Sequence, residues 1–285
     1  MKKHMLLIVL ATFGPMIMSV SNRQAFAAQA PFEAPTVVQA AGPSDTLIDA
    51  ALVAFRAELG GINNANNPGQ ATGFREINWD GGGATVTSPD PPETPFNGFL
   101  LTRGAQFITR GEGVTQATAE GLAILFSNPT YATNFVPFSP QRMFTPVGSN
   151  ITEVLFFVPG AADAASAVPA AVSGFGAIFV DVDQPEGSGA GRQANRRAST
   201  LIECFDADNE RVYSGFVPAA PGDGNLSFLG IVFPDARIAR VRITTGRVAP
   251  GPDETSRRDI VVMDDFIYGE PQALPAPAER TASTR

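Results

Sequence analysis

Four aspartates are the first candidates for metal binding, because they occur in two closely spaced pairs. Asp181 and Asp183 are two residues apart in an expected strand, so their side chains project to the same side of it. Asp264 and Asp265 are adjacent, so they project to opposite sides, and one of them can face a neighbouring strand. Ca²⁺ prefers several oxygen ligands from carboxylates and carbonyls. We therefore expect either a structural calcium site that ties strand ends together or acids at the rim of the fold that bind only water.

Three further acids are candidates for acid–base catalysis. Glycoside hydrolysis needs two carboxyl groups that flank a sugar, and it needs no histidine. Such a pair could come from Glu76, Asp80 and Glu153. The sequence does not show that any two of them converge, and acids beside turns are ordinary. A carboxylate-based glycoside hydrolase or lyase is therefore the alternative hypothesis for the function.

The other common catalytic side chains are confined to the N-terminus. The only histidine is His4, and the only lysines are Lys2 and Lys3. Without these residues a chain cannot form a Ser-His-Asp triad, a zinc site of the usual His/Cys type or a Schiff base. The net charge of −8 also disfavours binding to nucleic acid or to an anionic membrane surface. These absences favour a protein that is not an enzyme.

Aromatic side chains are the candidates for binding a ligand. An aromatic ring combines a large apolar face with specific geometry, which suits stacking on a sugar ring when the aromatic side chain is exposed. Trp79, Tyr131 and Tyr213 are the candidates for such contacts. The alternative for Trp79, the only tryptophan, is a place in the core or at its edge.

The N-terminus has the features of a secretory signal peptide. A basic start at residues 2–4 precedes an apolar stretch at residues 5–20, and the Ala-Phe-Ala sequence at residues 25–27 fits the rule for a cleavage site. We expect cleavage after Ala27, so that residues 1–27 are removed and the protein is secreted or periplasmic. The apolar run is shorter than the roughly 20 residues that a spanning helix needs, and no later stretch is long and apolar enough to span a bilayer.

The rest of the chain is expected to form one folded domain with flexible ends. Residues 28–43 are rich in Ala, Pro and Gln and are expected to be a linker. Residues 46–59 have apolar side chains at helical spacing and predict the one helix of the chain. The expected folded domain covers residues 44–271, and residues 272–285 are expected to be a disordered tail.

After the helix, short apolar runs alternate with turn signals. Strands are expected at residues 105–109, 122–126, 151–158, 174–182, 200–206, 211–217, 226–233, 238–245 and 259–268. Because no helical stretches separate these runs, the pattern favours a mainly β fold, an antiparallel, jelly-roll-like β-sandwich with one N-terminal helix. Cys204 falls within one of the strands and has no second cysteine to pair with, so we expect a buried, unreactive thiol.

Several segments carry a family resemblance. They are FREINWDG (residues 74–81), FVPG (157–160), GFGAIFVDVD (174–183), LSFLG (226–230), IARVRI (238–243) and VMDDFIYG (262–269). The set resembles uncharacterised secreted bacterial β-sandwich proteins and is similar to the exported jelly-roll-like domains that often carry a PEP-CTERM sorting tail. The resemblance covers roughly residues 46–271 and implies a sandwich with an extracellular or surface location. It also makes Asp264 or Asp265 the leading candidate for a calcium ligand.

The tail departs from the pattern of those sorted proteins. Glu270 and Pro271 are followed by neither an apolar helix nor a basic end. We therefore expect release or periplasmic residence rather than anchoring. The expected function is that of an exported, non-enzymatic module that binds carbohydrate or extracellular matrix, or has a structural role at the cell surface, with calcium as a candidate structural cofactor.

Overall fold

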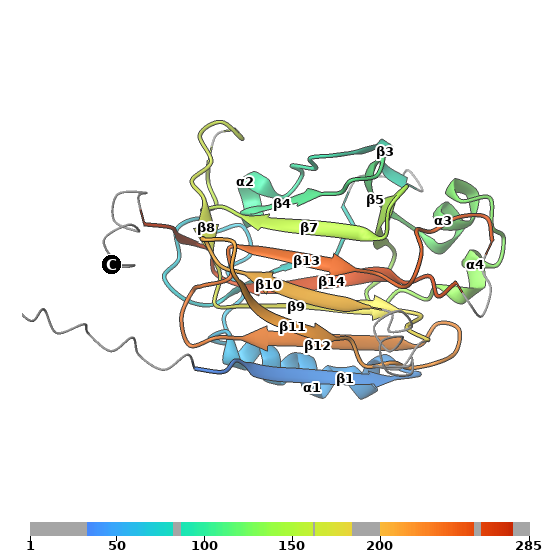
Figure 1. The fold of residues 1–285 in the computed structure, drawn as a ribbon, viewed down its shortest axis with the longest axis horizontal. Helices are drawn as coiled ribbons and strands as arrows, with labels where there is room; N and C mark the ends of the chain where they lie inside the picture. The colour runs from blue at the N-terminus through green and yellow to red at the C-terminus, as the bar shows by residue number, and fades with distance from the viewer. Residues whose placement is uncertain (1–32, 82–86, 162, 184–199, 254–257, 276–285) are drawn as a thin grey trace, which may run out of the picture. The chain divides into compact units, whose positions relative to one another are not determined.

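The computed structural model describes residues 33–81, 87–161, 163–183, 200–253 and 258–275. The predicted signal peptide and most of the predicted tail lie outside these residues. The described residues form two β-sheets that pack face to face, and helices cover the outer face of the larger sheet (Figure 1). All pairings between their strands are antiparallel, so the expected antiparallel β-sandwich is confirmed.

The strands of the larger sheet follow the order β1-β12-β9-β14-β6-β5-β3, and β2 pairs with β14. In chain order they are β1 (Thr36–Gly42), β2 (Phe74–Ile77), β3 (Thr87–Glu93), β5 (Gly113–Ala117), β6 (Met143–Val147), β9 (Gly174–Val180), β12 (Leu226–Val232) and β14 (Val262–Gly269). The smaller sheet has the order β11-β10-β13-β7-β4. Its strands are β4 (Ala105–Ile108), β7 (Ile151–Phe156), β10 (Leu201–Phe205), β11 (Arg211–Phe216) and β13 (Arg240–Thr244). A separate two-stranded ribbon joins β8 (Ala170–Ala171) to β15 (Gln272–Ala273).

Apolar side chains from both sheets form the core between them. Strand alternation determines which residues enter it: Val241 and Ile243 of β13 are buried there, and the residues between them are only half-buried. Trp79 lies in the same core and stacks on Phe144, with the ring centroids 4.0 Å apart. Cys204 is buried there too, and this burial raises the pKa of its thiol, which confirms the expected buried cysteine.

Helix α1 (Asp45–Glu58) confirms the expected helix and covers the outer face of the larger sheet. Its Phe55 ring packs edge-on against Phe228, with the ring centroids 5.3 Å apart. Gly176 and Gly230 lie beneath this ring, because a Cβ atom added to them would come within 2.8 and 2.5 Å of Phe55 atoms. The two glycines therefore allow the helix to lie close to the sheet, and they explain why β9 and β12 are buried on both faces.

Three short helices in the described residues were not expected. They are α2 (Leu100–Arg103), α3 (Ala119–Leu125) and α4 (Tyr131–Asn134). The strand expected at residues 122–126 is wrong, because this run lies in α3 and at its C-cap. Thr118 begins the helix by accepting a hydrogen bond from the Gly121 N–H at 3.0 Å. A short apolar run does not by itself distinguish a strand from a helical segment. Within the described residues, no helix is long and apolar enough to cross a membrane.

The chain before α1 belongs to the sheet and is not only a linker. Thr36–Gly42, which lies within the expected linker of residues 28–43, pairs along its whole length with β12. At the other end, Gln272 and Ala273 of the expected tail pair with β8. Backbone pairing of this kind depends on neighbouring strands, so residues of low β-propensity can still form an edge strand.

Candidate functional site

Asp264 and Asp265 lie at an irregularity in β14. The pairing of β14 with β9 shifts between Met263 and Phe266, although both of these residues face the core between the sheets. This places one extra residue on β14, and such a bulge re-aims side chains. Both carboxylates contact the same hydroxyl: Ser139 Oγ lies 3.2 Å from Asp264 Oδ1 and 2.7 Å from Asp265 Oδ1. The expectation that the two aspartates project to opposite sides is therefore wrong.

The two carboxyl groups titrate as a pair. Burial raises the pKa of Asp264 well above its ordinary value, and the charge of Asp265 raises it further. Burial also raises the pKa of Asp265, to about 6, although the hydrogen bond from Ser139 opposes this rise. Because two close, buried carboxylates repel each other, the pair retains one proton near neutral pH.

The chain itself occupies the oxygen atoms of these acids. The Phe138 N–H donates to Asp264 Oδ2 at 2.7 Å. In the same way, Asp80 Oδ1 accepts hydrogen bonds from the backbone N–H groups of Gln141 and Arg142. These hydrogen bonds hold the segment after α4 against the larger sheet. The contacts of Asp80 and Asp264 therefore indicate that both acids have a structural role.

Asp181 and Asp183 have other neighbours. Asp183 Oδ1 accepts a hydrogen bond from the Gly222 N–H at 2.8 Å, and the Asp183 N–H donates to Asp259 Oδ1 at 3.2 Å. Asp181 is buried, and its N–H donates to the Asn225 carbonyl at 2.9 Å. Among the residues that the structure describes, no group of three or more His, Cys, Asp or Glu side chains is placed to hold a metal ion. The calcium site stays a prediction.

The two glutamates considered for glycoside hydrolysis lie on opposite faces of the sandwich. Glu76 is on the outer side of the larger sheet, where it forms an ion pair with Arg56 of α1. Glu153 is on the outer side of the smaller sheet and pairs with Arg240 and Arg242, each at 2.7 Å. Partial burial favours the neutral form of Glu153, but hydrogen bonds from the two arginines outweigh this effect and lower its pKa. Glu76 and Glu153 therefore do not flank one sugar.

Two of the three aromatic residues considered for sugar binding are fully buried. The Trp79 Nε1–H donates to the Asp264 carbonyl at 2.9 Å. The Tyr131 hydroxyl donates to the Gly251 carbonyl at 2.9 Å. Neither residue presents a ring face to solvent, and Trp79 takes the alternative place in the core. Tyr213 is half-buried on β11 and packs against the core between the sheets.

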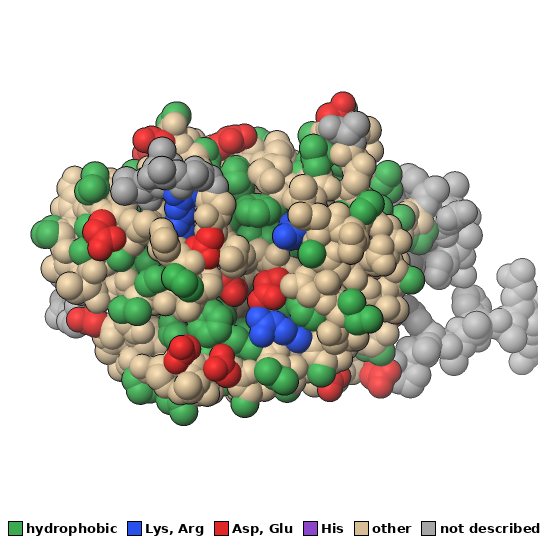
Figure 2. Space-filling model, turned by 180° about the vertical axis from the view of Figure 1, so that it is seen from behind, with side chains coloured by type: hydrophobic (Ala, Val, Ile, Leu, Met, Phe, Trp, Pro, Cys, Tyr) green, Lys and Arg blue, Asp and Glu red, His purple; other side chains and the backbone are tan. Residues whose placement is uncertain are grey.

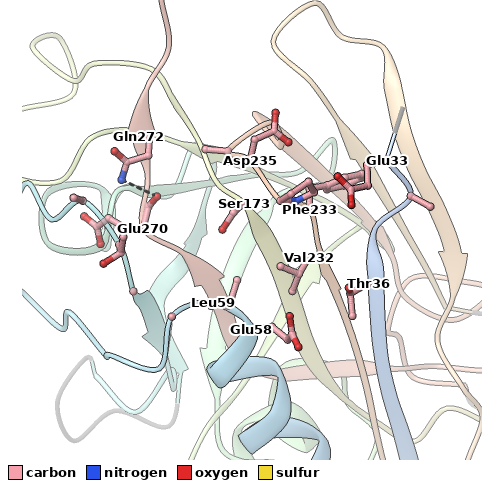
Figure 3. A pocket seen from close by; sticks show the side chains of 17 residues that line it. Glu33, Thr36, Glu58, Leu59, Ser173, Val232, Phe233, Asp235, Glu270 and Gln272 are labelled. Atoms are coloured by element: carbon pink, nitrogen blue, oxygen red, sulfur yellow. Dashed lines mark hydrogen bonds between the residues drawn. The ribbon is translucent and has the colours of Figure 1, made fainter. Parts of the chain in front are cut away.

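A pocket of about 500 Å³ lies at one end of the larger sheet (Figure 3). Its walls come from the chain that enters β1, the C-terminal end of α1, the loop at residues 71–73, the turn at residues 232–236 and the chain around residues 270–272. A volume of this size is typical of a small-molecule site. Leu59, Val232 and Phe233 contribute apolar surface, and polar side chains surround it.

A buried ion pair fixes one wall of this pocket. Arg75 Nε and Nη2 donate to the two carboxylate oxygens of Glu270, each at 2.8 Å, and both side chains are almost fully enclosed. Arg75 Nη1 also donates to the carbonyls of Ala65 at 2.8 Å and Thr102 at 3.0 Å. Asn64 Nδ2 donates to Glu270 Oε2 at 2.8 Å. Because its charge is compensated inside the protein, Glu270 adds a rigid wall without free negative charge.

Three exposed acids complete the pocket, and we call Glu33, Glu58 and Asp235 the pocket acids. Of the ion pairs between described residues, none involves Glu33 or Glu58, whereas Asp235 pairs with Arg237 at 2.5 Å. The described residues that line the pocket include no Lys, Arg or His. Sequence reasoning missed the pocket acids because they belong to three distant segments, which meet only when β1 pairs with β12 and α1 packs on the sheet.

Comparison with known proteins identifies no relative. No protein-family model matches the chain, no curated protein matches it, and no solved structure matches it. The resemblance to secreted sandwich domains therefore stays a prediction. The case for a function depends on the described residues.

Proposed function

We propose that this sandwich is a non-enzymatic binding module of an exported protein, and that its pocket holds part of a cell-surface or matrix glycan. The observation that carries the proposal is a pocket of about 500 Å³ whose rim carboxylates Glu33 and Glu58 have no ion-pair partner among the described residues. Carboxylates accept hydrogen bonds from sugar hydroxyls, and the apolar surface beside them can pack against the sugar ring. Export is supported by the N-terminal sequence alone.

The remaining side-chain chemistry favours binding over catalysis. Beyond His4 the chain has no histidine or lysine. The carboxyl pair of Asp264 and Asp265 accepts hydrogen bonds from the chain itself. A glycosidase needs two acids that face one sugar, and Glu76 and Glu153 each face arginines on opposite sides of the sandwich.

The distribution of acidic side chains on one face of the molecule favours the pocket, rather than a broad charged surface on that face, as the place where a ligand binds. Figure 2 shows the side opposite to that of Figure 1, where acidic side chains are scattered among apolar and uncharged ones. They do not form one continuous charged patch there. The pocket acids, in contrast, surround a hollow that can enclose part of a ligand.

A glycan array tests the proposal. We expect the full-length secreted protein to bind at least one class of glycan, and the double variant Glu33→Gln/Glu58→Gln to bind that class about tenfold more weakly, since each removes a charge-assisted hydrogen bond. The matched control is Glu210→Gln, because Glu210 is exposed in the turn between β10 and β11, outside the pocket. Absence of any glycan binding by the unmodified protein would exclude the proposed function.

A further inference from the structure

We infer that the pocket is selective for a sugar that carries a primary amine, and that the protonated amino group lies among the pocket acids. The inference rests on the proposed function, because it names the chemical class of the bound glycan. It goes beyond that function because a neutral glycan would not satisfy the charges that the pocket presents.

The pocket acids lie on different walls. Figure 3 shows Glu58 on one side of the hollow, with Glu33 and Asp235 on the other, and the three side chains do not converge on one point. Acids that coordinate a bare metal ion have to converge on it, within about 2.6 Å. An organic ammonium group needs only one of these acids as a direct hydrogen-bond acceptor, at about 2.8 Å, and the charges of the others then add a favourable negative potential around it.

The position of Glu58 adds to the negative potential. Glu58 is the last residue of α1, and the end of this helix lines the pocket together with Leu59 and Gly60. The C-terminal end of a helix carries a partial negative charge, so an acid is unfavourable there and a cation is favourable. Arg56, the basic residue in the last turn, pairs with Glu76 instead. The helix end and Glu58 therefore both favour a cation in the pocket.

Other acids of this protein are neutralised by arginine. Arg75 compensates Glu270, and Arg56 compensates Glu76. The described lining of the pocket supplies no such cation to Glu33 or Glu58. A bound ammonium group would provide it, because a charge-assisted hydrogen bond in a partly enclosed site is stronger than a neutral one.

Uncharged polar groups favour an amino sugar over a lysine side chain. The lining includes the hydroxyl-bearing residues Thr36, Thr72 and Ser173, and also Gln272, whose Nε2 donates to the Gln70 and Glu270 carbonyls at 3.1 and 3.3 Å. The hydroxyls of a sugar can form hydrogen bonds with these groups, whereas the stem of a lysine side chain is apolar. The combination of acids and hydroxyls therefore matches a ring that carries both an amine and hydroxyl groups.

The test compares two oligosaccharides of equal length, a tetramer of glucosamine and a tetramer of N-acetylglucosamine. Calorimetric titration at about pH 6 and low salt keeps the amine charged. We expect the amine-bearing tetramer to bind about fivefold more tightly, since an exposed ion pair contributes up to about fivefold. Glu58→Gln should weaken binding of the glucosamine tetramer about fivefold and leave that of the acetylated one within about twofold. Glu33→Gln is the second variant, Glu210→Gln is the control, and thermal melts confirm that each variant is folded.

The outcomes separate the two proposals. Equal or tighter binding of the acetylated tetramer, or of another neutral glycan on the array, would overturn the inference and leave the proposed function intact. Tighter binding of a tetralysine peptide than of the glucosamine tetramer would overturn the choice of a sugar. If neither tetramer nor any other glycan binds, the proposed function fails and the inference fails with it.

Discussion

Two groups of acids in this protein differ in what surrounds them. The buried pair, Asp264 and Asp265, receives hydrogen bonds from the segment after α4 and titrates at raised pKa values. The pocket acids, Glu33, Glu58 and Asp235, are exposed around a hollow. The contacts of the carboxylate oxygen atoms, more than the number of acids, therefore distinguish a structural cluster from a site that is open to a ligand.

The largest difference in the free energy of unfolding is expected between a variant of the buried acid Glu270 and a variant of the exposed acid Glu58, which both line the pocket. Glu270→Ala leaves Arg75 buried without its partner, and we expect it to lower the free energy of unfolding by about 3–5 kcal/mol. Glu58→Ala removes an exposed carboxylate and should change this energy by less than about 1 kcal/mol. Urea denaturation measures both. Similar losses of stability in the two variants would show that the buried Glu270 carboxylate contributes no more to stability than the exposed Glu58 carboxylate.

The buried pair should make stability depend on pH. A carboxyl group whose pKa is higher in the folded state stabilises the fold fully below its unfolded pKa, near 3.9, and this contribution is lost as the pH rises through the folded value, about 6 for Asp265. Relative to Asp264→Asn/Asp265→Asn, the unmodified protein should therefore lose about 3 kcal/mol of stability between about pH 4 and pH 7. Denaturation at several pH values measures this difference, and parallel profiles for the two proteins would contradict it.

Calcium binding would give Asp183 and Asp265 a second role, as ligands of a metal ion that stabilises the fold. If the calcium prediction holds, Ca²⁺ at about a hundredfold excess over its Kd should stabilise the fold by about 2.7 kcal/mol. We expect Asp183→Asn to remove this effect more completely than Asp265→Asn, because Asp265 is buried and bonded by Ser139, whereas Asp183 is only half-buried. Thermal melts with and without a chelator provide the measurement. An unchanged melting temperature, with no metal found by elemental analysis, would end the calcium hypothesis.

The smallest expected effect concerns the pocket without a ligand. Glu58 lies in the last turn of α1, where an acid opposes the helix dipole. Glu58→Gln should therefore stabilise the unliganded protein by about 0.3–1 kcal/mol. Precise thermal melts at low salt can detect this gain, with Glu210→Gln as the reference. A loss of stability in Glu58→Gln would indicate that Glu58 already has a stabilising partner.

Much of the fold could be predicted, because it depends on residues that are close in the sequence. The spacing within residues 46–59 indicates α1, and the alternation around Val241 indicates a half-buried strand. The bulge at Asp264 could not be predicted, since an extra residue is visible only against a partner strand. The pocket was missed for a similar reason: nothing local to Glu33 or Glu58 indicates that they share a hollow.

The fit of Phe55 above Gly176 and Gly230 links the interior of the protein to its rim. The ring lies three residues before Glu58 on the same helix, so whatever lifts the ring also shifts the carboxylate. A methyl group added to either glycine would push the Phe55 ring, and with it the C-terminal end of α1, away from the sheet. The position of Glu58 in the pocket therefore depends partly on the absence of a side chain at two positions of the sheet. Substitutions at residues that never touch a ligand can thus change the affinity for it.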